Sequence, residues 1–277
     1  MADWGSPPSE TYTTYAGYGG YTVTPSATAH QLGSWSNVGY IAAPVQGFWF
    51  QSGDWTLNNT TPRTAMFDIG IGDPGNEKVI VSNVVACAST STTANRAHQQ
   101  QYYFPLNLPA GQVNVRARSS YASTGGIRVG FTLTTTTSGL PGGALVDTYG
   151  AVTASTTGTQ VTAGSGAAFG SWTTIATSTN RIRSLLISVS NGNAAYSGTS
   201  MNTALDIGIG PNSGDVTPII RTSQIATQAT TGIPSPSVLG PYCVDLPSGS
   251  NLYARIAKDA AHSGANSNVY LVMYGVR

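Results

Sequence analysis

The chain has 277 residues, and only 8% of them are charged, against about 25% in an ordinary soluble protein. Its formal net charge is +1 without any cluster of lysine and arginine, which argues against a nucleic-acid partner because phosphate binding needs a basic surface. The sequence also lacks an apolar run of about 18 residues and a basic, apolar leader, so we expect neither a membrane span nor secretion.

A duplication organises the chain. The pentapeptide D-I-G-I-G occurs at 68–72 and again at 206–210, half a chain length later. In the same register, G-S-W at 33–35 recurs at 170–172, and L-P-A-G at 108–111 recurs as L-P-S-G at 246–249. We therefore predict a tandem pair of domains, divided into an arm over 1–17, a first repeat over 18–136, a linker over 137–155 and a second repeat over 156–277.

The arm carries aromatic residues at Trp4, Tyr12 and Tyr15 but shows no periodicity. Aromatic residues are sparse in disordered tails and frequent in interfaces, so we expect these three to anchor the arm to a partner. Because the arm precedes the first shared strand, we expect neither sandwich to need it to complete a sheet.

Short β-strands with period-2 alternation fill the first repeat, and no helical period competes with them. We expect strands near 20–25, 31–36, 44–51, 64–71, 78–86, 101–107, 112–121 and 126–134.

The clearest strand has Val113, Val115 and Ala117 facing inward and Arg116 and Arg118 facing outward, where the two arginines are candidate interface residues.

The segment 45–50 aligns with 182–187, so that an aromatic strand in one copy replaces an aliphatic strand in the other. Within this strand Trp49 is a further candidate interface residue, and it could also stack on a sugar.

About eight antiparallel strands per repeat predict an all-β protein made of two tandem, jelly-roll-like β-sandwich domains. An immunoglobulin-like sandwich is the alternative. Against it, neither repeat holds the paired cysteines around a tryptophan that such domains often show.

The pentapeptide is typical of a half-buried strand that runs into a turn, with Phe67, Ile69 and Ile71 on one face. Its other face holds an aspartate and two glycines, which let a neighbouring backbone approach closely. We predict a structural role for the aspartate, as an acceptor of hydrogen bonds, and keep a metal-binding or catalytic carboxylate as the alternative. The motif residues are Asp68, Gly70, Gly72, Asp206, Gly208 and Gly210.

The first copy also spells G-x-G-x-x-G over 70–75, which resembles a dinucleotide-binding fingerprint. That fingerprint requires a helix directly afterwards, but a short β-branched run at 79–81 follows instead. The second copy spaces its glycines differently. We therefore interpret both segments as strand, turn and strand.

The spacing of the histidine and acidic residues does not indicate a metal site or a catalytic site. None of the three histidines, His30, His98 and His262, has a second ligand at metal-binding spacing. The acidic turn over 73–77 could hold calcium, but its counterpart does not keep the carboxylates, so a plain turn is the preferred interpretation. A glycosidase would need two facing carboxylates, and no pair stands out. We predict no catalytic residue, no metal and no cofactor.

The two cysteines, Cys87 and Cys243, lie in different repeats at positions that do not correspond. We predict two buried, free thiols in a protein made in a reducing cytoplasm.

The ordered succession of G-S-W, D-I-G-I-G and L-P-x-G resembles a module in structural proteins of tailed bacteriophages. The resemblance covers 33–133 and 170–274. It implies a virion component such as a capsid decoration protein, a head fibre or a tail part, and it carries no catalytic residues. The aromatic strand over 47–50 departs from the pattern.

We therefore expect a non-enzymatic virion protein, made in the host bacterial cytoplasm, that decorates or cements the capsid exterior. Its expected partners are other copies of itself, with a trimer favoured, and the major capsid protein or other virion proteins, without nucleic acid or membrane. The alternative is a receptor- or carbohydrate-binding fibre that contacts a host-surface glycan through exposed aromatic residues such as Trp49, Trp55, Tyr102 and Tyr103.

Overall fold

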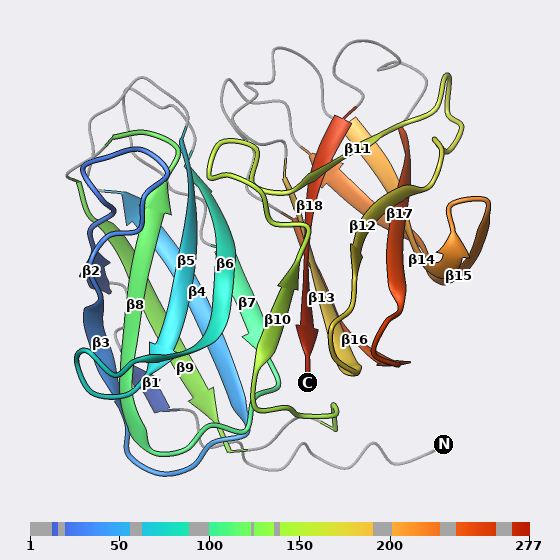
Figure 1. Cartoon of the computed structure of the whole chain (residues 1–277). Helices are drawn as coiled ribbons and strands as arrows, with labels where there is room; N and C mark the ends of the chain where they lie inside the picture. Colours follow the sequence, from blue (N-terminus) through green and yellow to red (C-terminus); the bar gives the residue numbers. More distant parts are fainter. Residues whose placement is uncertain are drawn as a thin grey trace, which may run out of the picture.

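The computed structural model describes residues 13–15, 20–55, 63–88, 100–122, 125–135, 139–190, 201–227, 237–258 and 268–277. All regular structure within these ranges is β-strand, arranged in four antiparallel sheets. The sheets pair into two sandwiches that stand side by side, one from each half of the chain (Figure 1).

The first sandwich contains one five-stranded sheet, β1 and β2 both on β9 followed by β4 and β7, and one four-stranded sheet in the order β3-β8-β5-β6. Its strands are β1 (Thr13–Tyr15), β2 (Tyr21–Val23), β3 (Ser36–Ile41), β4 (Gly47–Trp55), β5 (Arg63–Ile71), β6 (Lys78–Ala88), β7 (Gln100–Phe104), β8 (Gly111–Ser119) and β9 (Ile127–Thr134).

The second sandwich repeats this order, with β10 and β11 both on β18 followed by β13 and β16 in one sheet, and β12-β17-β14-β15 in the other. Its strands are β10 (Val146–Tyr149), β11 (Thr159–Thr162), β12 (Thr173–Thr177), β13 (Ile182–Ser190), β14 (Met201–Asn212), β15 (Asp215–Thr227), β16 (Ser237–Leu246), β17 (Asn251–Lys258) and β18 (Asn268–Val276).

The strand order identifies the topology. The two short strands that open each repeat, β1 with β2 and β10 with β11, can be counted as one broken strand. With the strands of each repeat then numbered from 1 to 8, the order within the sheets is 1-8-3-6 and 2-7-4-5 in both repeats. Such an arrangement of two interleaved Greek keys is the jelly roll. The predicted fold class is therefore confirmed.

The domain limits differ from the expected ones at two places. Part of the predicted arm forms β1, whose Tyr15 lies opposite Phe131 of β9. Part of the predicted linker forms β10, whose Tyr149 lies opposite the matching Met273 of β18. Each repeat thus begins earlier than expected, because two short strands with a break between them pair with one long neighbour, and neither is long enough to show period-2 alternation.

The second strand also lies later than expected, at Ser36–Ile41 instead of 31–36. Gly33 donates its backbone N–H to the carbonyl of Ala117, and regular pairing with β8 then runs from Ser36 onward. A register shift between Asn37 and Gly39 disturbs the alternation that would have marked this strand in the sequence.

The inward residues of the sandwiches follow the predicted pattern. Val113, Val115 and Ala117 are all buried. Phe48 and Phe50 of β4 are buried in the first sandwich, where Leu185 and Ile187 of β13 occupy the matching strand of the second. Side chains of different shape therefore fill the same layer.

The hydrophobic core of the first sandwich extends into the contact with the second sandwich, which also has a separate core of its own. Leu186, Val272 and Tyr274 of the second repeat are buried in the same cluster as the first repeat's aromatic residues. The Tyr274 hydroxyl donates to the carbonyl of Asn83 at 2.9 Å and accepts the backbone N–H of Val85 at 3.1 Å. The outer face of one sheet in the second sandwich thus packs against the β6 and β7 edge of the first.

Candidate functional site

The repeated aspartate is the centre of the candidate site in each domain. Asp68 on β5 is 6% exposed, and its Oδ1 accepts the backbone N–H of Asn83 at 3.2 Å. Its Oδ2 accepts from Nε of Arg116 on β8 at 3.1 Å. The guanidinium of Arg116 lies over the ring of Trp35, 4.4 Å from the centroid, which is a cation–π contact.

The second domain reproduces this arrangement. Asp206 is 3% exposed and accepts the backbone N–H of Thr222 at 2.8 Å and Nε of Arg255 at 3.0 Å. Arg255 lies over Trp172 at 4.4 Å and over Phe169 at 4.7 Å. In each domain, the arginine on the strand that follows L-P-x-G therefore contacts both the aspartate of D-I-G-I-G and the tryptophan of G-S-W.

A β-bulge explains why an aspartate is needed. The pairing of β5 with β6 shifts between Phe67 and Ile69, and Asn83 opposite the shift has a φ of 57°. The pairing of β14 with β15 shifts at the matching place, and Thr222 there has a φ of 52°. A bulged residue leaves its N–H outside the ladder, and the carboxylate supplies the missing acceptor.

The glycines of the motif make room for this arrangement. A Cβ at Gly70 would lie 3.1 Å from the Trp35 ring, and a Cβ at Gly208 would lie 3.2 Å from the Trp172 ring. At Gly72, which has a φ of 138°, a Cβ would lie 2.6 Å from the carbonyl oxygen of Asn76. The equivalent atom at Gly210 would collide with the carbonyl of Asp215. Close approach of the backbone therefore requires glycine at Gly72, Gly208 and Gly210, while at Gly70 an added Cβ would make a tight contact with the ring.

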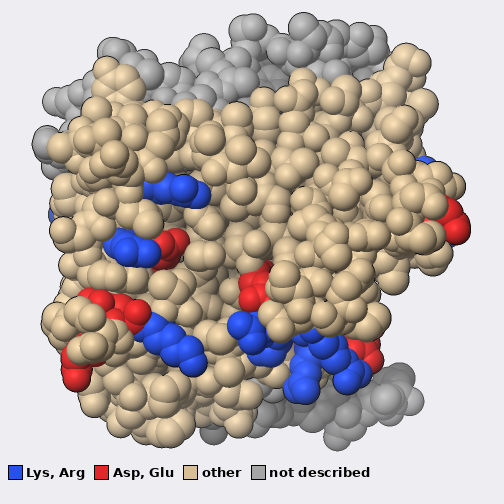
Figure 2. All heavy atoms as spheres, in the orientation of Figure 1, with Lys and Arg blue, Asp and Glu red and all other residues tan. Residues whose placement is uncertain are grey.

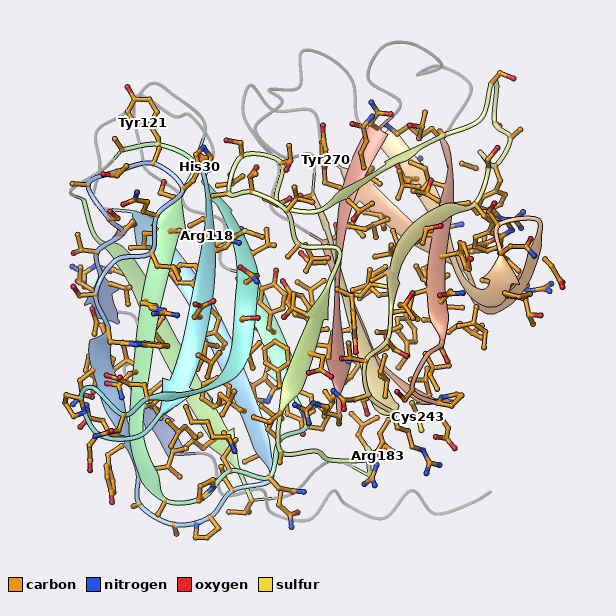
Figure 3. The ribbon with its side chains drawn as sticks, viewed as in Figure 1. His30, Arg118, Tyr121, Arg183, Cys243 and Tyr270 are labelled. Atoms are coloured by element: carbon orange, nitrogen blue, oxygen red, sulfur yellow. The ribbon has the colours of Figure 1, made fainter. Side chains whose placement is uncertain are left out.

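Arg116 and Arg118, the candidate interface residues of β8, both make contacts within the first domain, and their interface role stays a prediction. Both lie on the outer face of the sheet, but Arg116 is paired with Asp68, and Arg118 donates to Oδ1 of Asn83 and contacts Sδ of Met66. Figure 3 shows Arg118 between the strands of the first sandwich. Their guanidinium groups help to hold the bulge in place, because hydrogen bonds from a charged donor are stronger than those between neutral groups.

The remaining predicted residues have different outcomes. Trp49 is half-buried on the outer face of β4, where its ring lies 4.7 Å from that of Tyr103. Trp4 and Tyr12 lie outside the described residues, and Tyr15 is described only by its backbone. The acidic turn over 73–77 is exposed and is closed by the N–H of Asn76 donating to the carbonyl of Asp73.

The cysteine prediction is corrected in one respect. Cys243 is a free thiol, but it is exposed on β16 near Arg183 and not buried (Figure 3). It lies on the edge strand of its sheet, a position that an alternating sequence does not reveal. The side chain of Cys87 lies outside the described residues.

The contact between the domains is not evident from the sequence, and it buries Tyr102, contrary to the exposure expected for this aromatic residue; Tyr103 is buried as well. Tyr102 donates to the carbonyl of Val85 at 2.7 Å and lies 3.0 Å from the hydroxyl of Ser188. Thr148 likewise bonds the carbonyl of Ser82 across the two domains. The unbroken apolar run of β18, without alternation, was the available signal that both of its faces are covered.

Within the described residues, no group of three or more His, Cys, Asp or Glu is placed to hold a metal ion. No helix in this part of the chain is long and apolar enough to cross a membrane. Figure 2 shows a face that is mostly uncharged, with small groups of basic and acidic residues on its left side and lower part and an acidic group at its right edge.

Neither the protein families nor the curated proteins include a match to this chain. Solved structures with a partly similar fold include the crystal structure of the STIV MCP, with 12% identity, a TM-score of 0.43 and 96% coverage of both chains. Another is PNGase F, a glycosylasparaginase from Flavobacterium meningosepticum, with 10% identity, a TM-score of 0.40 and 96% coverage of both chains. The cowpea mosaic virus top component shows 8% identity and a TM-score of 0.40 over 96% of this chain and 89% of its own. Likenesses this slight do not bear on function.

Proposed function

We propose that this chain is a non-enzymatic structural protein of a phage virion that decorates or cements the capsid exterior. The observation that carries the proposal is the identical use of the repeated residues in both jelly rolls. Asp68 and Asp206 are each occupied by an arginine and a bulged N–H. A motif kept twice for the same folding task suits a building block better than a catalyst.

The surface chemistry supports the same proposal. Charged residues are 8% of the chain, and the cores of protein interfaces are depleted of charge. The sequence resemblance to structural modules of tailed phages is the reason for proposing that the particle is a phage virion. Under this proposal the protein is made in the bacterial cytoplasm, forms homo-oligomers, with a trimer expected, and contacts the major capsid protein.

Imaging of intact particles tests the proposal. Particles grown with an epitope tag after Arg277 should bind antibody at regular positions on the head, and cryo-electron microscopy should show paired jelly rolls there. Particles with the tag on a known tail protein serve as the control. Absence of the protein from purified particles would contradict the proposal, and label on the tail would contradict the capsid location.

A carbohydrate-binding fibre is the second candidate, and Trp49 favours it. Its ring is half-buried on the outer face of β4 and is backed by the buried ring of Tyr103, 4.7 Å away, so that its exposed part is available to stack on a sugar. Binding of the wild-type protein to host surface polysaccharide, lost in Trp49→Ala and kept in Tyr40→Ala, would support this function. A cement protein binds no polysaccharide in the same assay.

A further inference from the structure

The contact inside the chain joins two different surfaces. The first surface is the β6 and β7 edge of the first sandwich, where Tyr102 and Phe104 are fully buried. The second is the outer face of β13 and β18 in the second sandwich, where Leu186 and Tyr274 are fully buried. Because the two surfaces differ, the contact is heterologous, and a duplicated chain carries a second copy of each.

In the second copy of the edge, the residues that the structure describes are mostly exposed or half-buried. In β15, which corresponds to β6, Arg221 and Gln224 are exposed. In β16, which corresponds to β7, every residue except Leu246 is exposed or half-buried, including Tyr242. Long uncovered edge strands pair with other chains unless something covers them.

In the second copy of the face, the described outward residues are only half-buried. From Leu271 to its end, β18 is buried without a break, since the first sandwich covers its outer face. The corresponding β9 alternates, with Arg128, Gly130 and Thr132 half-buried on the outer face. On the neighbouring strand β4, the half-buried Trp49 occupies the position that the buried Leu186 occupies on the equivalent strand β13.

The pairings define which residues correspond across the two contacts. Thr132 lies opposite Trp49, and Tyr274 lies opposite Leu186. Gln224 follows the bulged Thr222 by two residues, as Val85 follows Asn83. Since Tyr274 bonds the backbone of Val85 inside the chain, Thr132 and Gln224 are the corresponding pair between chains.

We propose that the edge of β15 and β16 in one copy packs on the outer face of β9 and β4 in a second copy, head to tail, as the two sandwiches pack within the chain. Trp49 of one copy then packs on the neighbour's β16, which carries Tyr242, as Leu186 packs on the first sandwich within the chain. A heterologous contact of this kind produces closed rings or filaments. This proposal concerns the contact between copies and does not depend on the particle in which the protein is found.

Two variants and their mixture test the contact. Thr132→Lys damages the face, and Gln224→Lys damages the edge, so each alone should sediment as a monomer of 28.5 kDa while the wild-type protein sediments as a multimer. Mixed together they should form a heterodimer, because one keeps its edge and the other its face. The control Tyr40→Glu, at a residue 56% exposed on β3, should keep the wild-type mass. A monomeric wild-type protein, or a mixture that stays monomeric, would overturn the proposal.

Cross-linking provides a second measurement that does not disrupt the contact. In a Cys243→Ser background, Thr132→Cys and Gln224→Cys in one chain should yield covalent multimers under mild oxidation, whereas Tyr40→Cys with Gln224→Cys should not. Equal yields from the two pairs would refute the contact. Particle imaging remains a separate test, since absence from virions would contradict the proposed function and leave this result unchanged.

Discussion

Asp206 shows how one side chain can hold a domain together. It is 3% exposed, yet it is charged and sits among apolar strands. The backbone N–H of Thr222 and two nitrogens of Arg255 donate to it, at 2.8 to 3.0 Å. Such charge-assisted hydrogen bonds offset the desolvation of the carboxylate. The arginine in turn is fixed by the Trp172 ring.

We predict that Asp206→Asn lowers the free energy of unfolding by about 1 to 3 kcal/mol, because the arginine keeps its charge and loses its partner. Denaturant titration of the purified protein measures this change. Asp245→Asn is the matched control, since Asp245 also pairs with an arginine but on the exposed surface, and its unfolding midpoint should stay at the wild-type value. A shift of the wild-type melting curve by EDTA would instead indicate a bound metal.

Glycine at the motif can be tested in the same way. A Cβ at Gly208 would collide with Val216 and lie 2.9 Å from the carbonyl oxygen of Thr217, so Gly208→Ala should cost about 1 to 3 kcal/mol through overpacking. Gly53→Ala is the control, because its added Cβ meets nothing closer than 3.9 Å. Thermal unfolding compares the two variants. Equal melting temperatures would contradict the close approach of Val216 and Thr217 to Gly208.

At the scale of elements, the packing of β18 on β6 depends on one buried hydroxyl. Burial raises the pKa of Tyr274 well above its usual value, and the neighbouring Tyr102 adds to the shift. The folded protein therefore keeps this proton to a higher pH than the unfolded chain does. Its contribution to stability is fully present below pH 10.0, the usual pKa of tyrosine, and is lost as the pH rises through the folded value.

We predict that Tyr274→Phe is less stable at neutral pH by about 1 to 3 kcal/mol, because the N–H of Val85 and the carbonyl of Asn83 lose their partner. It should also lose less stability than the wild-type protein on going from about pH 9 to about pH 11, since it lacks the tyrosine whose pKa is raised in the folded state. Denaturant unfolding at several pH values measures both effects. A parallel alkaline loss in the two proteins would refute the role of Tyr274.

For the whole molecule, the shared core predicts joint unfolding of the two domains. Leu186 and Val272 of the second repeat belong to the same buried cluster as Phe104 of the first. Separation of the domains would expose these side chains to water.

We therefore predict a single calorimetric transition in which the calorimetric and van't Hoff enthalpies agree. Leu186→Glu, which buries a charge between the domains, should split this transition into two or lower its midpoint by several degrees. Arg183→Glu, on the same strand but at an exposed position, is the control and should leave the single transition intact. Two separate transitions in the wild-type protein would show that the domains unfold independently.

Much of the architecture followed from local sequence. Period-2 alternation in β8 and β9 predicted strands with one solvated face, because successive side chains on a strand point to opposite sides. The spacing of the repeated motifs predicted a duplication, and the strand count with the lack of helical periods predicted the jelly roll. These features depend on neighbours along the chain, which the sequence contains in full.

Only the tertiary structure decided how the repeats meet and how the motifs combine. Trp35, Arg116 and Asp68 lie far apart in the sequence and come together because β3, β8 and β5 are neighbours in one sheet. Equivalent strands also acquire different surroundings, since β18 is covered by the first domain and β9 is not. Side-chain pairing and burial across sheets depend on strand order and on the contact between domains, neither of which is encoded by the period of a single strand.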